Sequence, residues 1–271
     1  MAMDMDRVRD RGLVLLGCGK MGSAMLQGWL AGGLPATSVW VIDPHPSDWL
    51  IAQGVHLNTA LPETPALVLI AVKPQMMEQA LPTLSAMGNG ETLFLSVAAG
   101  TPIAFYERVL GVDTPIVRAM PNTPAAVGRG ITALVPNGPG GAAMDLAEAL
   151  LQAVGQTVRL ESESQMDAVT AVSGSGPAYV FHLIETLAAA GVNEGLPKDL
   201  ALALAKATVG GAGELAERAT EDPGQLRVNV TSPGGTTAAA LAVLMDVDTG
   251  FPALMKRAVA AAANRSRELG Q

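Results

Sequence analysis

A glycine-rich turn directly after a short apolar run constrains this chain more than any other feature. The run is Leu13–Leu16, and the turn after it has the pattern G-x-G-x-x-G and opens a helix-length segment. In a dinucleotide-binding domain the first glycine permits the tight turn, the second leaves room for a pyrophosphate, and the third lets helix and strand pack closely. Amides at the helix start attract the anionic oxygens. The candidate coenzyme-binding residues are therefore Gly17, Cys18, Gly19, Lys20, Met21 and Gly22, and the alternative is a tight turn without a ligand.

Short apolar runs alternate with helix-length segments over the first 160 residues. Several runs are apolar at consecutive positions, which is typical of parallel strands covered on both faces. The order predicts an α/β, Rossmann-like doubly wound sheet, with residues 1–160 as a dinucleotide-binding domain. The predicted strands are Leu13–Leu16, Val39–Ile42, Ala66–Val72, Thr92–Val97, Pro115–Met120, Ile131–Val135 and Thr157–Leu160, and the predicted helices are Met21–Ala31, Pro46–Gln53, Gln75–Met87, Pro102–Leu110 and Gly140–Ala153.

The second part of the chain, residues 161–271, has no convincing strand and is rich in alanine, leucine and valine. It predicts an all-α domain with helices at Ser164–Ala171, Ala178–Ala190, Lys198–Arg218, Thr236–Val247 and Pro252–Leu269. A few helices with small side chains make a thin core. We therefore expect this half to complete its burial against another subunit; a compact monomeric bundle is the alternative.

Composition excludes several classes of function. Acidic residues outnumber basic ones 25 to 17, for a formal charge of −8, and no run of Lys or Arg occurs, so nucleic acid and anionic membranes are not expected partners. The longest apolar stretches reach eight residues, whereas a membrane-spanning helix needs about 20. One cysteine and three histidines leave no expected metal site. The first twelve residues lack an apolar signal segment, so the expectation is a soluble cytoplasmic protein.

An acidic residue, Asp43, ends the second predicted strand and precedes Pro44. In dinucleotide-binding domains an acidic side chain at this place accepts hydrogen bonds from the adenosine ribose hydroxyls and repels the 2′-phosphate of NADP. Asp43 is a candidate coenzyme-binding residue, and on this residue alone NAD is favoured over NADP. The alternative interpretation is an ordinary turn aspartate.

Three further predicted strands end in residues that suit a ligand. Ligands bind at the carboxyl ends of the strands in open α/β sheets. Lys73 follows one strand, and the small residues Ala98 and Ala99 after the next leave room for a ribose or a nicotinamide ring. Asn122, between two prolines, can present its amide to that ring or belong to a rigid turn. Three such ends on one sheet edge are better evidence than any one of them.

Two glycine-rich segments interrupt the helical half. Ser173-Gly174-Ser175-Gly176-Pro177 breaks a helical pattern and restarts it, and Ser232-Pro233-Gly234-Gly235-Thr236-Thr237 stands directly before an Ala/Leu-rich helix. Serine and threonine followed by exposed amides at a helix start form a site for a carboxylate. An ordinary N-cap and hinge is the alternative for each.

Catalytic bases are scarce. The chain has five lysines and none between Lys73 and Lys198, and His182 is interpreted as structural. Dehydrogenases that act on alcohols usually need a Lys or His to take the hydroxyl proton. A C=N bond is less demanding, because an imine can enter already protonated. The missing base therefore favours an imine substrate.

Together these residues resemble the Δ1-pyrroline-5-carboxylate reductase family. Five stretches carry the resemblance, in the family's order and over nearly the whole chain: residues 17–25, Ala71-Val72-Lys73-Pro74, residues 118–124, residues 168–170 with 173–181, and residues 230–237 with Ser-Pro-Gly-Gly-Thr-Thr. The first is shared by many dehydrogenases, whereas the last two are specific.

The resemblance implies reduction of L-1-pyrroline-5-carboxylate to L-proline by a nicotinamide coenzyme, the last step of proline synthesis. It implies a Rossmann domain, a helical dimerisation domain, and dimers that assemble into larger homo-oligomers. The glycine turn with Val72 and Lys73 would hold the coenzyme, and Ala98 and Ala99 would lie near the nicotinamide. The implied substrate-binding residues are Glu163, Asn229, Ser232, Gly234, Gly235, Thr236 and Thr237, with the Thr237 hydroxyl, near the ring nitrogen, as the catalytic group.

One position departs from the family pattern. Relatives that use NADPH often carry a small neutral residue where this chain has Asp43, so both coenzymes stay open, with the resemblance favouring NADPH. Two other functions are weighed. A β-hydroxyacid dehydrogenase would carry a catalytic Lys on the helix after Gly176, and none is present there. A non-catalytic NAD(P)-binding protein would have no need of the Ser232–Thr237 segment.

Overall fold

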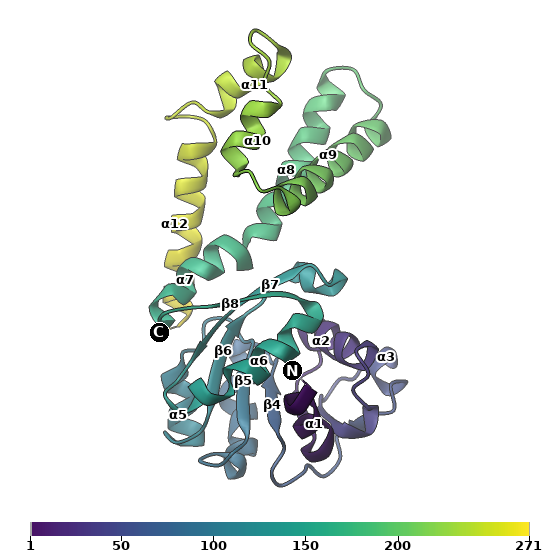
Figure 1. Cartoon of the computed structure of the whole chain (residues 1–271), viewed down its shortest axis with the longest axis vertical. Helices are drawn as coiled ribbons and strands as arrows, with labels where there is room; N and C mark the ends of the chain where they lie inside the picture. Colours follow the sequence, from purple (N-terminus) through teal and green to yellow (C-terminus); the bar gives the residue numbers. More distant parts are fainter. Residues whose placement is uncertain (1, 271) are drawn as a thin grey trace. The chain divides into compact units, whose positions relative to one another are not determined.

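The computed structural model describes residues 2–270, with side chains from Asp6 onward. Within these residues an eight-stranded sheet has the order β3-β2-β1-β4-β5-β6-β7-β8 (Figure 1). The strands are β1 (Leu13–Leu16), β2 (Val39–Ile42), β3 (His56–Leu57), β4 (Leu67–Ile70), β5 (Leu93–Ser96), β6 (Ile116–Met120), β7 (Gly130–Pro136) and β8 (Gly155–Arg159). The predicted doubly wound sheet is confirmed, because its first six strands run parallel in the Rossmann order.

The last two strands run against the first six. β7 pairs antiparallel with β6, with Arg118 opposite Val135, and β8 is parallel to β7. The connection from β6 to β7 contains only a short 3₁₀ turn, Thr123–Val127. A parallel return needs a crossover of about a dozen residues or more, so this short connection produces an antiparallel neighbour.

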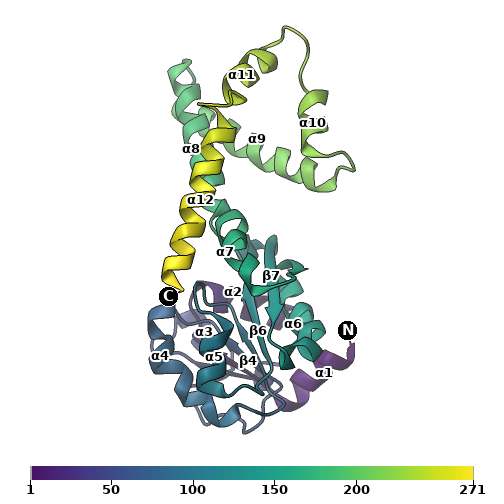
Figure 2. The ribbon, with the colours of Figure 1, turned by 90° about the vertical axis from the view of Figure 1, so that its left-hand side faces the viewer.

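Each face of the sheet carries its own hydrophobic cluster, because alternate residues of a strand point to opposite faces. Leu13 and Leu15 of β1 belong to one cluster, and Val14 and Leu16 belong to the other. The first face is covered by α1 (Ala2–Arg11), α2 (Lys20–Ala31) and α6 (Met144–Leu151). The second is covered by α4 (Met77–Ala80), the 3₁₀ segment Leu81–Met87 and α5 (Ile103–Leu110). Figure 2 shows α4 and α5 on one side of the sheet and α1 and α6 on the other.

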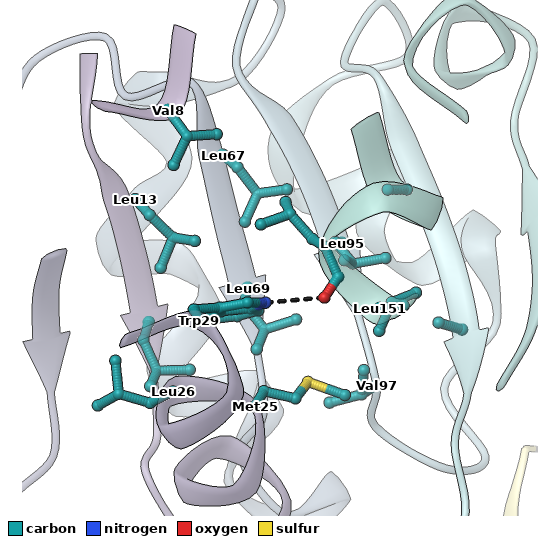
Figure 3. Close-up of a cluster of buried hydrophobic side chains, with 14 of the residues drawn as sticks. Val8, Leu13, Met25, Leu26, Trp29, Leu67, Leu69, Leu95, Val97 and Leu151 are labelled. Carbon is teal, nitrogen blue, oxygen red and sulfur yellow. Dashed lines mark hydrogen bonds between the residues drawn. The ribbon is translucent and has the colours of Figure 1, made fainter. Parts of the chain in front are cut away.

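The first cluster centres on Trp29 of α2, which is 2% exposed and packs among Leu67, Leu69 and Leu95 (Figure 3). Its indole Nε1–H donates to the carbonyl oxygen of Leu150 in α6 at 2.8 Å. A buried indole needs such a partner. This bond joins the helix that begins at the glycine turn to the last helix on the same face.

Several predicted elements differ in detail. The predicted helix Gln75–Met87 is broken into a 3₁₀ turn, α4 and a second 3₁₀ segment, because Pro82 has no N–H to donate. The two-residue strand β3, the helix α1 and α10 (Pro223–Asn229) were not expected. The segment Pro46–Gln53 contains only the short α3 (Asp48–Ile51), and Ser164–Ala171 contains α7 (Met166–Val169) and the start of a π-helical turn at Thr170–Gly174.

The rest of the chain is helical, as expected: no strand follows β8 in the residues that the structure describes. The helices are α8 (Gly176–Asn193), α9 (Lys198–Arg218), α10, α11 (Thr236–Leu244) and α12 (Phe251–Leu269). Between residues 175 and 262 only Ala201, Ala205 and Gly250 are buried. Large apolar side chains are exposed instead, including Phe181 at 58% and Val243 at 71%. These helices lack a core of their own within one chain.

The structure divides into two compact units, residues 1–174 with 263–271, and residues 175–262. The end of α12 therefore belongs to the first unit. There Ser266 is buried and its Oγ donates to Oδ1 of Asp167 at 2.6 Å. The predicted boundary after residue 160, between a dinucleotide-binding domain and a helical domain, stays a prediction. No helix among residues 2–270 combines the length and apolar character needed to cross a bilayer.

Candidate active site

The glycine turn closes tightly onto the sheet. Gly17 follows β1 with φ +87°, and its N–H donates to the carbonyl oxygen of Ile42 at 2.8 Å. A Cβ at Gly17 would lie 2.8 Å from Val72 Cγ1, and one at Gly22 would lie 2.6 Å from the carbonyl oxygen of Gly17. Both positions therefore need glycine for internal reasons: backbone conformation and close packing at Gly17, and close packing at Gly22.

Gly19 is different, because no atom lies within 4 Å of the position its Cβ would take. It is the N-cap residue of α2, and no side chain caps that helix start. The open space beside Gly19 and the uncapped N–H groups at the start of α2 both belong to the glycine turn. A bound pyrophosphate requires this combination. The residues present thus fit a dinucleotide coenzyme, and Lys20 is exposed at the first position of the helix.

Asp43 lies beyond the end of β2 and contacts the glycine turn directly. Its Oδ2 accepts from the N–H of Cys18 at 2.8 Å, and its Oδ1 accepts from the N–H of His45 at 2.8 Å. Burial, and next the negative charge of Asp43, raise the pKa of the Cys18 thiol to about 11. Cys18 is buried and is the only cysteine in the chain.

The ends of β4 and β5 lie at the same sheet edge as the glycine turn, because β1, β4 and β5 are parallel. Lys73, just beyond β4, is exposed. Ala98 is buried beyond β5 and Ala99 is exposed. The N–H of Ala98 donates to Ser96 Oγ, which forms a 2.5 Å hydrogen bond with the hydroxyl of Tyr106. This buried pair fixes the path of the chain beneath Ala98 and Ala99.

The side chain of Asn122 makes two hydrogen bonds that hold neighbouring segments of the first unit together. Its Oδ1 accepts from the N–H of Ile131 at 3.0 Å, and its Nδ2 donates to the carbonyl oxygen of Ser173 at 3.2 Å. The side chain thereby ties the end of β6 to β7 and to the π-helical turn. One of the two Nδ2 hydrogens of Asn122 is used in these hydrogen bonds. The contacts are those expected if Asn122 belongs to a rigid turn.

Glu163, expected from the resemblance as a substrate residue, pairs with a buried cation in the first unit. Its Oε1 lies 2.5 Å from Nη1 of Arg118 on β6, and it accepts from the N–H of Ile103 at 2.9 Å. Arg118 has only 8% of its side chain exposed, against 32% for Glu163. The pair lines an open hollow of about 410 Å³ together with Gly100, Pro102, Asp167 and Arg267.

The remaining candidate residues form a turn in the second unit. The N–H of Gly235 donates to the carbonyl oxygen of Ser232 at 3.0 Å, across Pro233 and Gly234, and Gly234 has φ +68°. Proline followed by a residue of positive φ is typical of a type II turn. Gly235 is the N-cap of α11, whose start has no side-chain cap. Ser232, Gly234 and Thr236 are exposed, Gly235 and Thr237 are half-buried, and the Oδ1 of Asn229, at the end of α10, accepts from Gln225.

Two residues of this architecture are not among the site residues predicted from the sequence. Asn58 follows β3 and holds the main chain of Asp43, since its Oδ1 accepts from Asp43 N–H at 3.0 Å and its Nδ2 donates to Asp43 O at 2.8 Å. Its φ of +52° is a conformation that asparagine tolerates better than most residues. Arg118 is the other; an arginine inside an apolar strand is a signal that a buried acidic partner exists.

Comparison with known proteins identifies the same family that the sequence motifs resemble. Residues 163–269 match a family model for pyrroline-5-carboxylate reductase dimerisation, and residues 13–100 match a model described as NADP oxidoreductase coenzyme F420-dependent. The chain is 38% identical to the pyrroline-5-carboxylate reductase of Pseudomonas aeruginosa, over 96% of this chain and 97% of that one. This chain belongs to the pyrroline-5-carboxylate reductase family.

Other members of the family extend the likeness. The reductase of Arabidopsis thaliana is 38% identical, with 94% of each chain covered. A solved structure of the Coxiella burnetii enzyme is 34% identical, with a TM-score of 0.89 over 96% of this chain and 99% of that one. A Plasmodium falciparum member solved with NADP bound is 28% identical, with a TM-score of 0.84 over 97% and 99%. The Rossmann-like domain and the helical dimerisation domain are thereby confirmed.

Proposed function

We propose that this chain reduces L-1-pyrroline-5-carboxylate to L-proline with a hydride from NAD(P)H, the final step of proline biosynthesis. The observation that carries the proposal is the 38% identity to a pyrroline-5-carboxylate reductase over nearly the full length of both chains. The glycine turn, with open space at Gly19, and the uncapped turn before α11 supply the two anion-binding elements that this reaction needs.

The coenzyme residues would act by binding and orientation. The N–H groups at the start of α2 would take the pyrophosphate, with Gly17, Cys18, Gly19, Lys20, Met21 and Gly22 forming the turn. Asp43, Val72, Lys73, Ala98, Ala99 and Asn122 would line the remaining coenzyme path. The bound coenzyme supplies the hydride, and the chain's contribution is to hold the nicotinamide and the imine carbon in contact.

The substrate would be held by its carboxylate at the start of α11. The amides of Gly235, Thr236 and Thr237 have no side-chain cap, so they can donate to a carboxylate. The Thr237 hydroxyl would lie near the ring nitrogen as the catalytic group. Asn229, Ser232, Gly234 and Glu163 complete the proposed substrate-binding set. No lysine stands between Lys73 and Lys198, which suits an imine that arrives protonated.

The proposal includes the assembly. The matched family model describes dimerisation, and the helices of residues 175–262 bury few side chains within one chain, which supports a homodimer. We propose that dimers assemble into a larger homo-oligomer and that the protein is cytoplasmic, without a membrane or a nucleic acid as partner. The net charge of −8 supports the last point.

A substrate panel tests this function. Purified full-length protein is given NADPH or NADH with pyrroline-5-carboxylate, and in separate reactions NADP or NAD with a 2-methyl-3-hydroxy acid. Oxidation of the reduced coenzyme only when the pyrroline is present supports the proposal. Oxidation of the hydroxy acid instead would favour a β-hydroxyacid dehydrogenase, and calorimetric coenzyme binding without turnover of any cyclic imine would favour a binding protein.

A replacement of Thr237 tests the site. Thr237→Ala removes the proposed catalytic hydroxyl and keeps the backbone amides of the turn, so turnover should fall at least about tenfold while coenzyme affinity stays near that of the wild type. Unchanged turnover would remove Thr237 from the mechanism. Thr236→Ala is the matched control, because only the backbone amide of Thr236 is assigned a role.

A further inference from the structure

The position of Asp43 is fixed by four hydrogen bonds. The carboxylate accepts from the N–H groups of Cys18 and His45, each at 2.8 Å. The main chain of Asp43 is bracketed by Asn58, which accepts from its N–H at 3.0 Å and donates to its carbonyl oxygen at 2.8 Å. A rotation of this loop that turned the carboxylate away would break several of these bonds at once. The negative charge therefore stays beside the glycine turn.

The carboxylate of Asp43 lies beside the position expected for the adenosine ribose of a bound coenzyme. In a Rossmann domain the residue at the end of the second strand faces the ribose hydroxyls. Here Asp43 follows β2 and contacts the second residue of the glycine turn. Its charge acts on that turn, since it contributes, after burial, to the raised pKa of Cys18. Each oxygen accepts one backbone hydrogen bond and retains capacity for a hydroxyl.

Cations that could offset a 2′-phosphate are scarce around this loop. No lysine or arginine occurs between residues 21 and 72, a stretch that contains Asp43, Asp48 and Glu63. His56 stacks on Trp40 with ring centroids 4.5 Å apart, and its Nε2 lies 3.0 Å from the carbonyl oxygen of Thr37. Apart from His56, the nearest groups in sequence that can carry a positive charge are His45, which is exposed, and Lys20, at the start of α2.

We infer that Asp43 makes this reductase select NADH over NADPH. Its carboxylate accepts the ribose hydroxyls of NADH, and it opposes the 2′-phosphate of NADPH, for which the β2–α3 loop provides no lysine or arginine. The inference rests on the proposed function in one respect, namely that the bound coenzyme is a nicotinamide dinucleotide that donates a hydride. A unit charge a few ångströms from a phosphate in a partly solvated site changes affinity by about tenfold or more.

The test measures binding alone. Dissociation constants for NADH and NADPH are obtained from quenching of tryptophan fluorescence or by calorimetry, on the full chain without substrate. The variants are Asp43→Asn, which keeps the size and one acceptor but removes the charge, and Asp43→Ser. Glu63→Gln is the matched control, because it removes one exposed charge before the amino end of β4, at the opposite edge of the sheet. Thermal unfolding confirms that each variant is folded.

The wild type should bind NADH about tenfold or more tightly than NADPH. Asp43→Asn and Asp43→Ser should lower this ratio about tenfold, mainly by strengthening NADPH binding, whereas Glu63→Gln should leave it unchanged. Equal or tighter binding of NADPH by the wild type would overturn the inference, as would an unchanged ratio in a folded Asp43 variant. Because no substrate is present, a failure to reduce pyrroline-5-carboxylate would refute the proposed function without affecting this result.

Discussion

Arg118 and Glu163 form a partly buried ion pair at 2.5 Å that joins β6 to the segment before α7. The arginine is on an inner strand of the sheet and has 8% of its side chain exposed, so the carboxylate compensates a charge that is largely shielded from water. The same carboxylate oxygen caps the N–H of Ile103 at the start of α5. Glu163 therefore has a structural role, whatever its contact with substrate.

Removal of that carboxylate should destabilise the protein. Breaking a buried ion pair costs about 3–5 kcal/mol, and because Glu163 is 32% exposed we expect about 2–3 kcal/mol for Glu163→Ala. This corresponds to a fall of roughly 5–10 °C in Tm, measured by calorimetry. The neighbouring Glu161→Ala, which removes an exposed carboxylate, should leave Tm within about 1 °C. An equal Tm for Glu163→Ala and the wild type would contradict the structural role, and an unchanged KM for the pyrroline would remove Glu163 from the substrate set.

Cys18 should react slowly with alkylating reagents until strongly alkaline pH. Its pKa is raised to about 11, first by burial and then by Asp43, and only the thiolate is nucleophilic. Because Cys18 is the only cysteine, the rate of iodoacetamide labelling, followed by mass spectrometry, reports this thiol alone. The rate should still be rising between pH 9 and pH 11.

The same shift affects stability. A thiol whose pKa is raised on folding stabilises the native state fully below its ordinary value of 9.0, and this contribution is lost as pH rises through about 11. Asp43→Asn should lower the pKa of Cys18 modestly, since burial is the larger cause. If the rate of iodoacetamide labelling of the native protein stopped rising near pH 9, this would contradict the raised pKa of Cys18.

Gly22 and Gly19 of the turn should differ, the first supporting the fold and the second coenzyme binding. Gly22→Ala should destabilise the fold by about 1–3 kcal/mol, because its Cβ would lie 2.6 Å from the carbonyl oxygen of Gly17. Gly19→Ala should change stability by less than about 1 kcal/mol, because its Cβ meets no protein atom within 4 Å. Its methyl group should instead weaken coenzyme binding roughly tenfold or more. Chemical denaturation and coenzyme titration separate the two effects, and unchanged affinity in Gly19→Ala would place the pyrophosphate elsewhere.

The exposed apolar side chains of the second unit should be needed for assembly. Phe181 on α8 is 58% exposed, and an aromatic side chain in a subunit interface contributes strongly to association. Phe181→Asp should shift the mass in sedimentation velocity towards the monomer. Val112→Asp is the control, since Val112 is 69% exposed in the first unit. A wild-type protein that sediments as a monomer would contradict the proposed dimer.

The sequence predicts the sheet well because its strands are buried on both faces and appear as unbroken apolar runs, such as Leu67–Ile70. The glycine turn is equally visible, because its conformation and close packing require glycine at fixed positions. The two-residue strand β3 carries no comparable signal, and the direction of β7 depends on the length of its connection to β6 rather than on the composition of the strand.

The site is predictable only in part. Asp43 can be recognised from its place after β2, and its hydrogen bond from His45 is local, two residues along the chain. The other three hydrogen bonds come from Cys18 and Asn58, which only the fold brings to Asp43. The ion pair of Glu163 with Arg118 joins residues after β8 and on β6. An arginine within an apolar strand indicates an acidic partner, but no local pattern identifies that partner as Glu163. The turn before α11 is readable because proline followed by glycine selects its type. The roles of its residues toward substrate stay predictions.

The most direct test of the proposed reaction follows the hydride itself. Reduced coenzyme carrying deuterium at the transferable position of the nicotinamide ring is mixed with pyrroline-5-carboxylate and the purified protein, and the product is analysed by mass spectrometry and chiral chromatography. We predict L-proline with one deuterium at C5 and an equal amount of oxidised coenzyme. Unlabelled proline, or coenzyme that stays reduced while the pyrroline persists, would contradict the assignment.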